Sequence, residues 1–140
     1  MDAIVKLLKD KNYHLEKFYT LNEQELINFV DGNFDNLEVF YQSREVILDL
    51  IRCIDRMIES ASEESQVVNV SAEMKKEILN YMDAKNDLVS RILAQDLQIL
   101  SVIESEKSNI IKELRQVQSA KKAVGSYKSG DASNKLDEEA

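Results

Sequence analysis

The sequence predicts an all-α protein, an elongated antiparallel bundle of three helices in which the last helix is the longest. Proline is absent, glycine occurs three times in 140 residues, and 31% of the residues are charged. This composition is typical of a helical domain. Residues 71–124 lack glycine and proline and repeat apolar residues at steps of three and four, which is helical spacing. A single helix of that length would reach roughly 80 Å at 1.5 Å per residue.

The first predicted helix spans residues 2 to about 30. Asp2 places an acid in the first turn, where the helix dipole favours negative charge. Residues 31–33, Asp-Gly-Asn, form a turn signal, so the next helix is expected to run back antiparallel. The apolar positions of the first helix share one face: Ile4, Leu7, Leu8, Leu15, Phe18, Leu26 and Phe29.

The second predicted helix runs from about residue 34 to residue 60 and carries two adjacent apolar rows. Two rows make a broad apolar face, which predicts the middle position in the bundle. Arg44 lies on one of these rows, where its stem can be buried while its head reaches water or pairs with an acid. Residues 60–69, SASEESQVVN, lose the helical period and are expected to form a mobile loop.

The third predicted helix covers residues 71–124. Residues 94–96 put an acid in its apolar seam and residues 104–109 are a polar run, so a break at either place would give four helices instead of three. Residues 126–140 are small, polar and charged and are expected to be disordered. The predicted seam comprises Ile78, Met82, Val89, Ile92, Ile99, Ile103, Ile110, Leu114, Val117 and Val124.

Charge and cysteine content restrict the class of protein. The net charge of −8 argues against nucleic-acid binding, which depends on neutralising phosphates. Residues 1–70 carry 7 basic and 14 acidic side chains, whereas residues 71–125 carry 9 basic and 8 acidic ones. Cys53 is the single cysteine, and no run approaches eighteen apolar residues, so we expect a cytosolic protein that does not insert into membranes.

The residues that support catalysis are scarce. His14 is the single histidine and has no glutamate three residues before it, so a metal site is not expected. Cys53 lies beside Ile54 in the second predicted helix, where an unreactive thiol is the common finding. The three glycines are too far apart to form a phosphate-binding loop. We therefore expect neither an enzyme nor a bound cofactor.

A binding surface on the third helix is the remaining possibility. Apolar residues beside the predicted seam would leave more apolar surface than a monomer normally exposes. This face could receive an amphipathic helix of a partner, or it could pack on the chain's own helices or in a homodimer. Tyr127 follows the helix and is either incidental or an anchor for a pocket on a partner. The additional row contains Leu79, Val89, Leu93, Leu97, Leu100, Ile111 and Leu114.

Three segments resemble the FlgN/FliT group of flagellar type III export chaperones. They are LINFVDGNFDNLEVFYQSREVILDLI (residues 26–51), ILAQDLQILSVIESEKSNIIKEL (92–114) and SAKKAVGSYKSG (119–130). The resemblance implies a cytosolic helical chaperone that binds the C-terminal helix of a hook–filament junction or filament cap protein. It further implies that the chaperone prevents premature assembly of this substrate and delivers it to the type III export gate. Chain length favours the FlgN-like members.

The expected partner-binding residues lie on the third helix and just after it. The substrate helix is expected to bury its apolar face on one row, and the resemblance implies that Tyr127 takes part in docking to the export gate. Three alternatives stay open: a structural coiled-coil or adaptor subunit, a homodimeric bundle, and a chaperone of a virulence type III system. The expected substrate row is Ile99, Ile103, Ile110, Leu114 and Val117.

Overall fold

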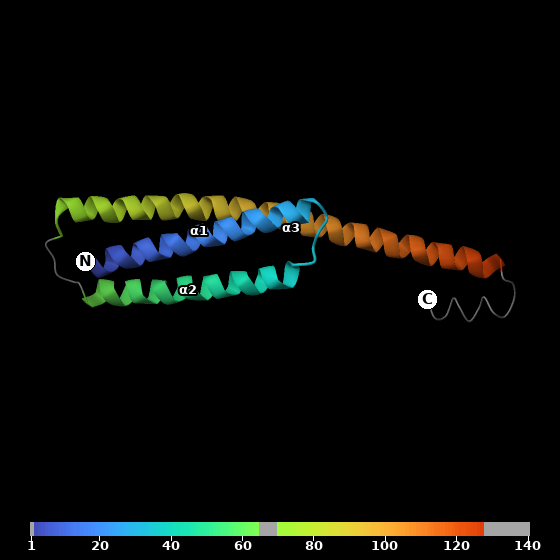
Figure 1. Ribbon diagram of the computed structural model, residues 1–140, viewed down its shortest axis with the longest axis horizontal. Helices are drawn as coiled ribbons and strands as arrows, with labels where there is room; N and C mark the ends of the chain where they lie inside the picture. The colour runs from blue at the N-terminus through green and yellow to red at the C-terminus, as the bar shows by residue number, and fades with distance from the viewer. Residues whose placement is uncertain (1, 65–69, 128–140) are drawn as a thin grey trace. The chain divides into compact units, whose positions relative to one another are not determined.

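The protein is all-α, with three helices among the residues that the computed structural model describes, 2–64 and 70–127. The helices are α1 (Asp2–Val30), α2 (Leu37–Glu64) and α3 (Ala72–Tyr127), and α3 is the longest (Figure 1). The predicted fold class is therefore confirmed. The chain divides into two units, residues 1–100 and residues 101–140.

The helix limits agree with the prediction for α1 and differ for the other two helices. Helix α2 begins three residues later than expected and continues to Glu64, so part of the predicted loop is helical. Helix α3 is continuous through residues 94–96 and 104–109, so the described residues form three helices and not four. Residues 65–69 and 128–140, which cover the rest of the predicted loop and tail, lie outside the described residues.

The turn after α1 explains why α2 starts late. Gly32 takes a φ of 84°, which is left-handed and suits glycine, and the amide of Asn33 donates to the carbonyl of Asn28 at 2.8 Å. The Asn33 side chain then accepts a hydrogen bond from the amide of Asp35 at 3.1 Å. This local hydrogen bonding competes with helix formation, so the helix cannot begin before Leu37.

In the unit formed by residues 1–100, α1, α2 and the first part of α3 lie side by side (Figure 1). Each helix turns one row of residues, spaced at three and four, toward the other two. For α1 the buried residues are Ile4, Leu8, Asn12, Leu15, Phe18, Asn22, Glu25 and Phe29, and for α2 they are Phe40, Ile51 and Ile54. Part of α3 completes the core with Ile92, Gln95 and Ile99.

The inward row of α3 differs from the predicted seam. The structure turns Ile78, Ile92 and Ile99 inward as expected, but Met82 and Val89 face solvent. In this part of α3 the predicted seam is therefore rotated about the helix axis relative to the row that faces inward. The residues turned inward are Met74, Ile78, Tyr81, Lys85, Leu88, Ile92, Gln95 and Ile99.

Three phenylalanines close the end of the bundle where α1 turns into α2. The Phe29 ring stacks on the Phe34 ring with centroids 5.1 Å apart and meets the Phe40 ring edge to face at 5.4 Å. Phe29 and Phe40 are almost fully buried. Aromatic pairs of this geometry add to the stabilisation that burial alone gives.

Polar side chains in the core fix how α3 lies against α1. The Asn22 side-chain amide donates to Gln95 Oε1 at 3.1 Å, and Gln95 Nε2 donates to the carbonyl of Tyr19 at 3.0 Å. Near the other end of the unit, Asn12 donates to the carbonyl of Tyr81 at 3.0 Å. A shift of α3 along α1 would leave these buried groups unpaired, at a cost of about 1–3 kcal/mol for each.

Arg44 connects α2 to α3, and of the two possibilities that the sequence left open for its head group, water or an acid, the structure shows the acid. Its guanidinium donates to Asp96 Oδ1 at 3.0 Å and lies over the rings of Phe18 and Phe40, 4.8 and 5.2 Å from their centroids. Both charged side chains are mostly shielded from water, with relative accessibilities of 18% and 31%. The ion pair is therefore screened less than a surface pair.

We predict that Arg44→Ala lowers the free energy of unfolding by about 2 kcal/mol, because it leaves Asp96 without its cation and removes packing from two rings. Urea unfolding followed by circular dichroism measures this loss. Arg52→Ala is the matched control, since Arg52 pairs with Asp49 at 2.8 Å but is exposed, and its loss is expected to cost less than about 0.5 kcal/mol. Equal effects of the two substitutions would contradict a structural role for Arg44.

Candidate partner-binding surface

The six residues predicted to bind partners fall in different environments. Ile99 is 2% exposed and belongs to the bundle core, so it is not accessible to a partner in this structure. Ile103 is half-buried. Tyr127 is the last residue of α3, and its side chain lies outside the described part of the chain. The other three side chains, Ile110, Leu114 and Val117, are 48%, 57% and 55% exposed.

The helical segment of the second unit presents its side chains to solvent. Every described side chain from Lys107 to Ala123 is exposed. Ile110, Leu114 and Val117 follow one another at steps of four and three, so they lie on one face of the helix, with Ile111 beside them. The structure therefore brings three of the predicted residues together as an exposed apolar row.

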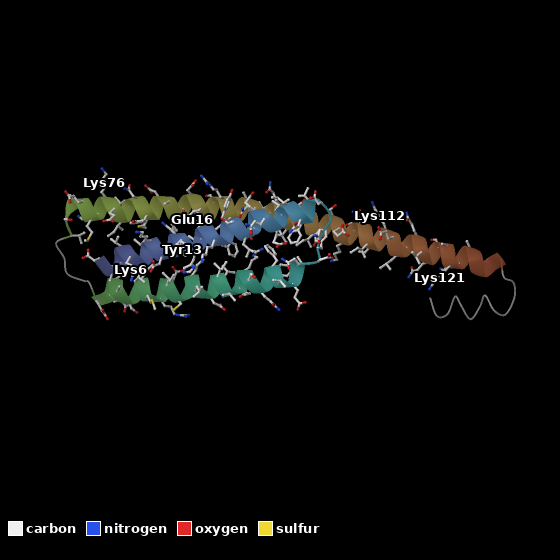
Figure 2. All side chains as sticks on the ribbon, in the orientation of Figure 1. Lys6, Tyr13, Glu16, Lys76, Lys112 and Lys121 are labelled. Atoms are coloured by element: carbon white, nitrogen blue, oxygen red, sulfur yellow. The ribbon has the colours of Figure 1, made fainter. Side chains whose placement is uncertain are left out.

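Basic side chains are in excess on this segment, both at the two ends of the apolar row and on the other side of the helix. Lys112 and Lys121 project to opposite sides of α3 (Figure 2), and Lys107 and Arg115 are also exposed. Residues 101–123 carry 5 basic and 3 acidic side chains, whereas residues 1–100 carry 11 basic and 19 acidic ones. The segment can therefore bind an amphipathic helix through its apolar face and favours acidic groups beside that face.

The first unit exposes a further set of apolar residues on α3. The sequence predicted this row and the structure confirms its exposure: Leu79, Val89, Leu93, Leu97 and Leu100. Helix α2 adds Val46, Leu50 and Met57, which are also exposed and which the sequence did not single out for binding. The sequence pattern placed Leu50 and Met57 on one of the two apolar rows of the second predicted helix, so it gave no signal of their exposure.

The described residues hold few groups with catalytic potential. Two open depressions, of about 350 and 400 Å³, lie on single helix faces, one on α2 beside Cys53 and one on α1 beside Tyr13. His14 Nδ1 is buried and forms no hydrogen bond within the described structure. No group of three or more His, Cys, Asp and Glu in this part of the chain is placed to hold a metal ion.

Two further observations concern membrane-spanning helices and similarity to known proteins. None of the helices described here is long and apolar enough to cross a bilayer. Comparison with family models, with curated proteins and with solved structures gives no match for this chain. What the protein binds therefore has to be inferred from the chemistry of its own exposed rows.

We predict that Ile99→Asp and Leu114→Asp have opposite outcomes although both place a carboxylate on α3. Ile99→Asp buries an unpaired charge in the core and is expected to cost more than about 3 kcal/mol and to unfold the first unit. Leu114→Asp places the charge in water and is expected to retain the helical circular dichroism spectrum. Loss of helix in Leu114→Asp would mean that this residue packs on the chain's own core.

Proposed function

We propose that this protein is an export chaperone of the flagellar type III kind, which binds a helical segment of a hook–filament junction or filament cap protein. The main support is the exposed apolar row Ile110, Leu114 and Val117, in a helical segment whose described side chains are all exposed from Lys107 to Ala123. The three-helix architecture agrees with the fold that the sequence resemblance implies. The chaperone acts in the cytoplasm, keeps its substrate from assembling early and delivers it to the export gate.

The physical basis is burial of apolar surface without catalysis. A substrate helix that lays its apolar face on the row gains roughly 25 cal/mol for each Å² removed from water. Ordering a flexible substrate segment offsets part of that gain, so binding is moderate and release is feasible. Ile103 lies at the half-buried edge of the row, and Ile99 is not part of it because it is in the core.

A structural coiled-coil or adaptor subunit is the second candidate function. It is supported by the spacing of three and four in the exposed row, which suits a permanent helical partner as well as a transient one. The rate of release separates the two functions. A chaperone releases its substrate helix within the time of export, whereas a scaffold subunit holds its partner through extended washing.

We predict that Ile110→Asp combined with Leu114→Asp weakens substrate capture at least 100-fold while the spectrum stays helical, because two charges replace the apolar contact. The probes are the C-terminal helices of the hook–filament junction and cap proteins of the same organism, titrated by fluorescence anisotropy. Ser108→Asp with Gln116→Asp is the control, since it adds the same charge to exposed polar positions away from the row. Unchanged capture by the first variant would contradict the proposed surface.

We predict that Tyr127→Ala leaves substrate capture unchanged and weakens binding of the chaperone–substrate complex to the export gate, because an aromatic anchor supplies much of such an interface. Pull-down by the cytoplasmic domain of the gate protein measures the second step, and secretion of the substrate from cells measures the outcome. Normal secretion by this variant would remove Tyr127 from the mechanism. Tyr127→Phe is expected to retain most gate binding.

A further inference from the structure

Helix α3 carries two adjacent rows of mostly apolar residues in the first unit: one faces the bundle, and the other is exposed except at Asp96, which pairs with Arg44 of α2. The exposed one, here called the outer row, repeats at steps of three and four along residues 79–100. A straight helix has 3.6 residues per turn, so a repeat of 3.5 is the signature of pairing with another helix. The outer row is Leu79, Met82, Asn86, Val89, Leu93, Asp96 and Leu100.

The second unit carries a row with the same repeat. This row, here called the distal row, begins at a half-buried isoleucine and is otherwise exposed. It contains the residues of the proposed substrate surface together with two lysines. The distal row is Ile103, Lys107, Ile110, Leu114, Val117 and Lys121.

We propose that the distal row of one copy of this chain packs antiparallel on the outer row of a second copy. In antiparallel pairing the two rows match layer by layer, and four of the six layers contain no charged side chain. Each chain has one outer row and one distal row, so two copies satisfy both and form a closed dimer. The layers are Leu100–Ile103, Asp96–Lys107, Leu93–Ile110, Val89–Leu114, Asn86–Val117 and Met82–Lys121.

Charge complementarity favours a second copy over an unrelated helix. Asp96 is the charged residue of the outer row, and antiparallel matching places it opposite Lys107 of the distal row. Oδ1 of Asp96 accepts a hydrogen bond from Arg44. Because a carboxylate has further acceptor sites, Asp96 can also accept a hydrogen bond from Lys107 of the second copy. The net charges agree, because residues 1–100 are strongly acidic and residues 101–123 carry a basic excess.

The alternative parallel pairing of two copies is unfavourable for the same reason. In a parallel, in-register dimer each residue lies opposite its own copy, so Asp96 would face Asp96 and Lys107 would face Lys107. Like charges at a helix interface are destabilising. The sequence of the two rows therefore specifies the antiparallel direction.

The oligomeric state tests the proposal directly. Sedimentation equilibrium and light scattering of the purified full chain are expected to give twice the 16.1 kDa chain mass at micromolar concentration. Leu93→Asp and Ile110→Asp are each expected to give monomers that stay helical, and Lys107→Glu is expected to weaken the dimer at least about tenfold. Val46→Asp is the matched control, since Val46 is exposed on α2 and belongs to neither row. A wild-type monomer at every concentration would overturn the proposal.

Disulfide trapping tests the direction and the register. In a Cys53→Ser background, chains with Leu93→Cys mixed with chains with Ile110→Cys are expected to cross-link under mild oxidation, because the two positions share a layer. Each variant alone is expected to remain uncross-linked. Efficient self-linking of either variant alone would indicate parallel pairing and would contradict the proposal. Neither experiment contains a substrate. A result that disproves the dimer therefore leaves the proposed chaperone function standing, and a failure of substrate capture leaves the dimer standing.

Discussion

A helix in a three-helix bundle can turn only one narrow row of side chains toward its two neighbours. In the first unit α1 uses the row from Ile4 to Phe29, and α3 uses the row from Met74 to Ile99. Apolar residues outside these rows, such as Leu93 and Leu100, are left in water. Because each Å² of apolar surface removed from water yields roughly 25 cal/mol, these residues represent stabilisation that only a further helix can supply. The single constraint of bundle geometry thus produces both the core and the exposed apolar rows.

Polar residues within the inward rows determine which of many similar packings is adopted. Leucine and isoleucine rows slide past one another at little cost, whereas the hydrogen bond between Asn22 and Gln95 and the ion pair between Arg44 and Asp96 form in one register. Burying these side chains reduces the apolar area of the core and adds little net stability. These side chains instead make the packing specific, because their polar contacts fix one position of α3 along α1 and α2.

The sequence predicted the three helices, the antiparallel turn at Gly32 and the exposure of Ile110, Leu114 and Val117, because periodicity and glycine act locally. It predicted only part of the inward row of α3, namely Ile78, Ile92 and Ile99, since neighbouring rows repeat at the same spacing. Tyr81 and Gln95 lie off the predicted seam, yet both make hydrogen bonds to α1. Ile99 was assigned to the partner surface because the register between helices, set by side chains 52 and 73 residues apart, cannot be read from one helix alone.

The exposed helix from Lys107 to Ala123 has a consequence for the lifetime of the protein in the cell. A helix without tertiary packing opens frequently, because its stability rests on local propensity alone. Cellular proteases cleave segments in their open form, at a rate set by how often opening occurs. We expect a companion helix lying on this segment to suppress opening, so that chains with a companion are degraded more slowly than surplus chains. Turnover would then bring the abundance of the protein close to that of whatever covers the segment.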